Sequence, residues 1–244
     1  MTAPSPVSKI TFDERHSQAW SIRPEAAAAM QPSHPGDASY EKAAEALRAR
    51  RMEVTANVDL PLRDELLSRT DVLVLAHPSD PRWESTTGLG SPVLDPEELD
   101  AVEAFVAAGG GLVVLAESEQ EKYGNNLGEL VGRFGIGIAN ETVQDYGSHR
   151  ANTPSWVLAD VLAGERGTGG DILARVHEAC FYRAGTLIVD EQAPGVQVLA
   201  RTSPTASTPD APLALAVRHG AGRVIVLADS DLFGDDCIEA LDHE

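Results

Sequence analysis

Acidic, imidazole and hydroxyl side chains directly follow four short apolar segments of this sequence, where loops are expected to begin. The seven candidate site residues are Asp13, His16, His77, Glu117, Ser118, Asp229 and Asp231. Carboxylates and imidazoles together can bind a divalent cation, carry out acid–base steps or hold a polyol by hydrogen bonds. The simpler alternative for each carboxylate is a loop or helix cap, because an acidic chain has carboxylates at most loop starts. No spacing matches a recognised metal loop, so we expect no metal and no cofactor.

The apolar segments that precede these residues have the pattern of strands in an α/β fold. Val72–Ala76 and Leu112–Ala116 are continuous apolar runs, typical of strands covered on both faces. Predicted helices alternate with the predicted strands along residues 9–143, and this alternation favours parallel strands joined by right-handed crossovers. The predicted strands are Lys9–Phe12, Met52–Val58, Val72–Ala76, Leu112–Ala116 and Ile136–Val143, and the helices are one capped by Ser39, Arg63–Ser68, one capped by Asp95, and Asn125–Phe134.

The C-terminal part is less regular and is predicted to add antiparallel strands to one edge of the sheet. Val157–Leu162 reads as a helical turn, followed by a Gly164–Gly170 loop, and His219–Gly222 reads as a tight hairpin. The strands predicted there are Thr186–Val189, Val196–Arg201, Leu213–Arg218 and Arg223–Ala228. We therefore expect a three-layer, flavodoxin-like α/β fold with a mostly parallel sheet, forming a single domain over 1–244. Only two helical turns fit after Cys237, so a longer protein stays an alternative.

This topology places the candidate residues at one rim of the sheet. In open α/β sheets, ligands bind beyond the carboxyl ends of the strands. Two tryptophans, Trp83 and Trp156, are expected to cover the core, with stacking against a ligand as the alternative.

Composition excludes several classes of partner. The chain has 19 basic and 38 acidic residues, a net charge of -19, and a pI near 4.6. Such a surface repels phosphate backbones and anionic lipids, so we expect neither nucleic acid nor membrane partners. Two cysteines are too few for a disulfide framework. No apolar run approaches the length of a membrane span and no signal peptide is recognisable, so we expect a cytoplasmic protein.

Three sequence blocks in register resemble a known superfamily. They are Ile10–His16, Tyr123–Ile136 continuing to Asn140–Val143, and Gly222–Phe233. These blocks resemble the glutamine-amidotransferase-like domain of gliding-motility ABC-transporter auxiliary proteins and of an intraflagellar-transport subunit. Trehalose-utilisation-type proteins are more distant relatives of similar topology.

The resemblance implies where catalytic residues of the active amidotransferases would lie. Their nucleophilic cysteine occupies a sharp turn after the fourth strand, flanked by very small residues. Ser118 falls at this position, and Gln120 stands where a glycine is required. The later His-x-Glu pair has no match, because Asp229-Ser230-Asp231 occupies that region. We therefore expect no amidotransferase activity and assign no catalytic residue.

Three hypotheses remain open at this point. The first is a non-catalytic module that binds a small polar ligand or a protein partner at the strand-end rim. The second is a hydrolase or lyase of polar, sugar-like substrates, with His16 or His77 as base and Glu117 or Asp231 orienting it. The third is a structural domain of a larger assembly, which predicts an exposed apolar patch. Two imidazoles clustered with a carboxylate would favour the enzyme, and carboxylates that cap helices or pair with arginines would favour the binding module.

Overall fold

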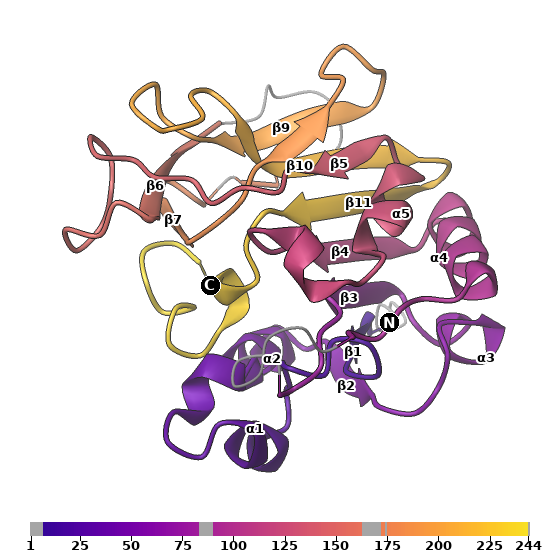
Figure 1. The fold of residues 1–244 in the computed structure, drawn as a ribbon. Helices are drawn as coiled ribbons and strands as arrows, with labels where there is room; N and C mark the ends of the chain where they lie inside the picture. Colours follow the sequence, from indigo (N-terminus) through magenta and orange to yellow (C-terminus); the bar gives the residue numbers. More distant parts are fainter. Residues whose placement is uncertain (1–6, 83–89, 163–171, 174, 244) are drawn as a thin grey trace, which may run out of the picture.

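The computed structural model describes residues 7–82, 90–162, 172, 173 and 175–243 (Figure 1). Its parallel strands lie in the order β2-β1-β3-β4-β11, the order of a flavodoxin-like sheet extended by β11. Their bounds are β1 (Lys9–Asp13), β2 (Glu53–Asn57), β3 (Val72–Ala76), β4 (Gly111–Leu115) and β11 (Gly222–Leu227). The predicted α/β fold class and the mostly parallel sheet are therefore confirmed. The strand predicted at Arg223–Ala228 is corrected: it was expected among the antiparallel edge strands, but as β11 it lies inside the sheet and pairs parallel with β4.

Antiparallel strands continue the same sheet beyond β11, as predicted. Their order is β11-β10-β9-β6-β7, and all four pairings are antiparallel. The bounds are β10 (Pro212–His219), β9 (Val196–Arg201), β6 (Trp156–Val161) and β7 (Ala179–Tyr182). The hairpin between β10 and β11 closes with His219 opposite Gly222, as the sequence predicts.

Three local predictions are corrected by the structure. The helical turn over Val157–Leu162 is wrong, because this segment is β6, which pairs with β7 and β9. The strand over Ile136–Val143 is shorter and lies outside the main sheet: β5 (Ile136–Ile138) pairs only with β8 (Leu187–Val189) among the described residues. The strand predicted at Thr186–Val189 therefore does not join the edge of the main sheet either. Strand β7 was not expected. In each case the pairing partner lies far away along the sequence. The predicted Gly164–Gly170 loop lies outside the described residues.

The helices begin close to where their caps predict. The capping box of α4 (Pro96–Ala107) joins the Asp95 carboxylate to the Glu98 N–H at 2.8 Å and the Glu98 carboxylate to the Asp95 N–H at 2.9 Å. For α2 (Glu41–Ala49) the cap residue is Tyr40 rather than Ser39, whose hydroxyl accepts from the Glu41 N–H at 3.2 Å. The remaining helices are α1 (Pro24–Met30), α3 (Asp64–Leu67), α5 (Leu127–Gly132) and the 3-10 turns η1 (Pro35–Ala38), η2 (Gln120–Tyr123) and η3 (Asp231–Phe233).

Alternate residues of each strand supply two separate cores, one on each face of the sheet. Leu73 and Leu75 of β3 pack with α3, α4 and α5, whereas Val74 and Ala76 pack with α2 and Trp20 on the other face. This arrangement makes the fold three-layered. No helix within the described ranges is both long and apolar enough to cross a bilayer.

Candidate functional site

A cavity of about 520 Å³ lies beyond the carboxyl ends of β3, β4 and β11. His77, Glu117 and Asp231 reach it from the ends of these three strands. The opposite wall comes from the segment before β6 and the end of β7, and the C-terminal segment around Cys237 closes a third side. The volume lies within the range of about 300–1,000 Å³ that is usual for small-molecule sites.

Carboxylates form the floor of this cavity. Glu117 accepts hydrogen bonds from the Ser118 N–H at 2.8 Å, the Ser118 hydroxyl at 3.1 Å and the Ser230 hydroxyl at 2.8 Å. Behind the floor, the fully buried Asp229 accepts from the backbone N–H groups of Tyr182 at 2.5 Å and Asp231 at 2.9 Å. Burial raises the pKa of Glu117, and burial together with the charges of Asp231 and Glu117 raises the pKa of Asp229 well above its usual range. These carboxyl groups therefore lie close enough to repel one another.

His77 is the second polar feature of the cavity wall. Its side chain lies against the ring of Tyr123, with 4.6 Å between the ring centroids, and the residue is only 4% exposed. Its Nδ1 is buried and has no hydrogen-bond partner. Burial, with a smaller effect of the Lys122 charge, lowers the pKa of His77 to about 3. The imidazole is therefore neutral at physiological pH and is a poor general base.

Burial of a neutral histidine makes stability depend on pH. An unfolded histidine gains its proton below a pH of about 6.5, whereas folded His77 resists protonation down to about pH 3. Between these pH values protonation stabilises the unfolded state. The free energy of unfolding is therefore about 2 kcal/mol lower at pH 5 than at neutral pH. We expect His77→Phe to remove this loss when urea unfolding is compared at pH 7.5 and pH 5. The control His34→Phe removes an exposed imidazole, and equal pH profiles for both variants would refute this origin of the acid sensitivity.

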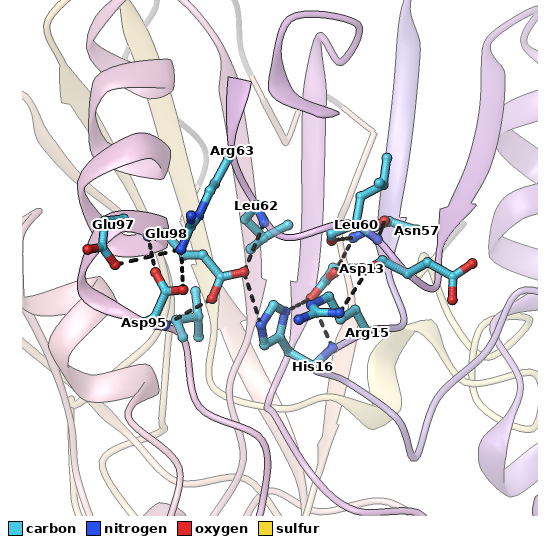
Figure 2. A network of polar contacts seen from close by, with 12 residues as sticks. Asp13, Arg15, His16, Asn57, Leu60, Leu62, Arg63, Asp95, Glu97 and Glu98 are labelled. Atoms are coloured by element: carbon cyan, nitrogen blue, oxygen red, sulfur yellow. Dashed lines mark hydrogen bonds and ion pairs between the residues drawn. The ribbon is translucent and has the colours of Figure 1, made fainter. Parts of the chain in front are cut away.

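His16 and Asp13 lie elsewhere, in a buried network beside the N-terminus of α4 (Figure 2). The His16 Nδ1 lies 2.7 Å from the Asp13 carboxylate, and its Nε2 lies 3.4 Å from the Glu98 carboxylate. Asn57 donates to Asp13 at 2.8 Å, and the Leu62 N–H donates to Glu98 at 2.9 Å. Burial lowers the pKa of His16, but the hydrogen bond and charge of Asp13 and the charge of Glu98 outweigh it, so the pKa is raised. The two carboxylates therefore favour the protonated form of this histidine.

Strand alternation explains why Asp13 and Glu117 lie on opposite faces of the sheet. In β1, Ile10 and Phe12 pack in the core with α2, so Asp13 points toward the opposite face, where α4 lies. In β4, Val113 and Leu115 pack on the α2 face, and Glu117 shares their parity. Three of the seven residues line the cavity, Ser118 and Asp229 contact the lining residues from behind, and Asp13 and His16 belong to the α4 network.

The sequence reasoning did not identify the arginine wall of the cavity. Arg150 and Arg183 line it, and the Arg150 Nη1 donates to the Tyr182 hydroxyl at 2.9 Å. The nearby residues Ala151 and Arg183 have positive φ angles of 54° and 55°, a conformation that non-glycine residues adopt rarely. No local motif marks these positions, because the pairing of β6 with β7 brings them to the cavity.

Aromatic side chains complete the lining. Trp20, Tyr123, Trp156 and Tyr182 all border the cavity, and Trp156 meets Tyr182 edge to face with 5.3 Å between centroids. Trp156 packs against the buried cluster of Cys180, Tyr182 and Cys237, as expected, and it also borders the cavity. Trp83 lies outside the described residues. Aromatic faces beside carboxylates and guanidinium groups are suited to hold a small polar molecule with an apolar body.

The thiol and serine groups near the site are poor nucleophiles. Burial raises the pKa of Cys180 to about 11, and burial with the charge of Asp236 raises the pKa of Cys237 further above its usual range. Both thiols are therefore protonated at neutral pH. The Ser118 hydroxyl, at the position that corresponds to the amidotransferase nucleophile, donates to Glu117 and is 2% exposed. In the part of the chain that the structure describes, no group of three or more potential ligands could hold a metal ion.

Comparisons with known proteins identify a family and a fold. The family model described as Domain of unknown function (DUF4350) matches residues 33–244. No curated protein matches the chain. Three solved structures share the fold at low sequence identity. The mmIFT52 N-terminal domain has a TM-score of 0.72 at 15% identity, covering 96% of this chain and 92% of its own.

The other two structures are less similar. Cytoplasmic Protein STM3548 from Salmonella typhimurium has a TM-score of 0.55 at 13% identity, over 93% of this chain and 92% of its own. A ThuA-like protein from Bacteroides uniformis has a TM-score of 0.54 at 15% identity, over 100% of this chain and 89% of its own. The mmIFT52 and ThuA-like structures share the fold that the resemblance to an intraflagellar-transport subunit and to trehalose-utilisation-type proteins implies.

Proposed function

The chain belongs to the DUF4350 family of domains of unknown function, and we propose that it acts as a non-catalytic, single-domain binding module of the amidotransferase-like superfamily. Its ligand would be a small polar molecule held in the cavity at the strand ends. The observation that carries this proposal is the unpartnered Nδ1 of the buried His77 in the wall of a cavity that Glu117 and Asp231 also line. Buried polar atoms almost always have a partner, and a ligand would supply one here.

The arrangement of the polar groups supports binding rather than catalysis. The two candidate bases do not cluster: His16 is buried between Asp13 and Glu98, and His77 stays neutral beside Tyr123. Asp95 caps α4, and Asp229 bonds two backbone N–H groups, so these carboxylates have structural tasks. This is the pattern that favours a binding module over a hydrolase or lyase.

A thermal-shift screen followed by calorimetry tests the proposal. Purified protein is screened against amino acids, sugars, carboxylic acids and nucleosides, alongside Glu117→Gln and His77→Phe. A ligand present at 100 times its Kd stabilises the protein by about 2.7 kcal/mol, which is readily seen in the melting temperature. We expect one class to stabilise the wild type and the matched control Glu119→Gln, whose side chain is 56% exposed, but not the two cavity variants.

Two results would overturn the proposal. If no class of small molecule shifts the melting of the wild type, the cavity does not bind a small polar ligand. If a stabilising compound is instead turned over, and Glu117→Gln or His77→Phe abolishes turnover while Glu119→Gln does not, the protein is an enzyme and the hydrolase or lyase hypothesis replaces the binding module.

A further inference from the structure

Two walls of the cavity carry opposite charges. Arg150 and Arg183 lie on the wall built by the segments around β6 and β7, and Glu117 and Asp231 lie at the ends of β4 and β11. We propose that the ligand is a zwitterion of the free amino-acid class, with its carboxylate against the two arginines and its ammonium group against the two carboxylates. This inference rests on the proposed function and specifies its ligand.

The arginine wall is suited to receive an anion. Within the described residues, Arg150 and Arg183 have no carboxylate within ion-pair distance, although the chain has 38 acidic residues to 19 basic ones. The guanidinium group of Arg150 donates one hydrogen bond to the neutral Tyr182 hydroxyl and offers further N–H donors. Paired N–H donors of arginine match the geometry of a carboxylate, which makes this wall a carboxylate receptor.

Hydrogen bonds anchor the main chain at both arginines. The Arg150 N–H donates to the Trp156 carbonyl at 2.9 Å, and the Arg183 N–H donates to the Ser155 carbonyl at 2.7 Å. These bonds fix the backbone from which the two arginine side chains extend, whereas the Arg183 side chain itself is exposed.

The carboxylate floor is suited to receive a cation. Glu117, Asp229 and Asp231 lie near enough to one another to repel, and the repulsion is strongest when all three are ionised. An ammonium group beside Glu117 and Asp231 would relieve this repulsion and offer three N–H donors to their oxygens. The unpartnered imidazole of His77 borders the same region as an independent sign of a missing polar partner.

The cavity also limits the size and body of the ligand. A volume of about 520 Å³ accommodates one free amino acid of any type. The rings of Trp20, Tyr123 and Trp156 supply apolar surface for the amino-acid side chain between the two charged walls. A ligand with both charges close together and an apolar body satisfies all three parts of the lining.

Titration calorimetry with matched probes tests the zwitterion. The free proteinogenic amino acids are titrated first, and the tightest binder is then compared with its decarboxylated amine and its deaminated acid. For phenylalanine these are phenethylamine and hydrocinnamate. We expect both analogues to bind about tenfold to hundredfold more weakly, the worth of a hydrogen bond to a charged group.

Arginine variants show which wall holds which charge. We expect Arg183→Gln to weaken the binding of the amino acid and of the deaminated acid but not that of the amine. We expect Arg183→Lys to recover part of the lost affinity. The control Arg48→Gln removes an equal charge from the exposed face of α2 and should change nothing. Binding of all three probes with equal affinity, or binding of neutral sugars alone, would contradict the zwitterion proposal but would remain consistent with the proposed binding function. Absence of binding by any small polar molecule would overturn both.

Discussion

Replacing Glu98 with alanine is expected to lower the free energy of unfolding by about 3–5 kcal/mol, the usual cost of removing one partner from a buried ion pair. The Glu98 carboxylate accepts from the backbone N–H groups of Leu62 and Asp95, both at 2.9 Å, and faces the imidazole of His16 at 3.4 Å (Figure 2). The substitution leaves both buried donors without an acceptor and removes half of the negative charge around His16. Urea unfolding at pH 7 measures the loss.

The neighbouring Glu97→Ala is the matched control. Its side chain is 72% exposed and lies 3.6 Å from Arg63, so the loss should stay below about 0.5 kcal/mol. The contribution of His16 to the free energy of unfolding also changes with pH in a defined direction. Because its folded pKa is raised, the stabilisation is complete below about pH 6.5 and fades as the pH rises through the folded value. Equal stability losses for Glu97→Ala and Glu98→Ala would contradict the assigned role of the network.

Gly222→Ala is expected to destabilise the protein by about 3 kcal/mol, at the upper end of the usual cost of overpacking. A Cβ atom on Gly222 would lie 2.1 Å from the Val106 carbonyl oxygen and 2.3 Å from the Gly110 carbonyl oxygen. Both are backbone atoms, where α4 ends and β4 begins, so neither can move without disturbing the parallel pairing of β4 with β11. Chemical denaturation measures the change.

Gly128→Ala provides the matched control. Gly128 lies in α5, and a Cβ atom there meets nothing within 4 Å. Alanine in a helix is favoured over glycine by about 0.5–1 kcal/mol, so this variant should be slightly more stable than the wild type. If both alanine variants unfold at the same denaturant concentration, the close approach of the β10–β11 hairpin to α4 does not make a side chain at Gly222 destabilising.

Local patterns were sufficient where the chain pairs with near neighbours or caps its own helices. The apolar runs around Val74 and Val114 predicted buried parallel strands, and Asp95 followed by Glu98 at the third helical position predicted the start of α4. The prediction failed at β6 and β7. The residues of β6 have no regular alternation, and β7, more than fifteen residues later in the chain, supplies the partner that makes β6 a strand.

For the candidate site, too, the sequence patterns grouped some residues that lie together at the cavity and some that do not. The rule that strand ends converge located His77, Glu117 and Asp231 at one cavity. The same rule grouped Asp13 and His16 with them, because position along a strand does not specify the face toward which a side chain points. The alternation of Ile10, Phe12 and Asp13 contained that information, but it could be used only once the faces had been assigned to α2 and α4.

The sequence by itself determined the α/β class, the first four parallel strands and the chemical types of the residues at the strand ends. These depend on apolar periodicity, capping and crossover handedness, which act over short stretches of chain. Only the tertiary structure decided that Arg150, Arg183 and the aromatic rings face Glu117 across a cavity, and that His16 does not. The physical reason is that antiparallel pairing between distant segments, and the burial of each strand face against a particular helix, place these side chains.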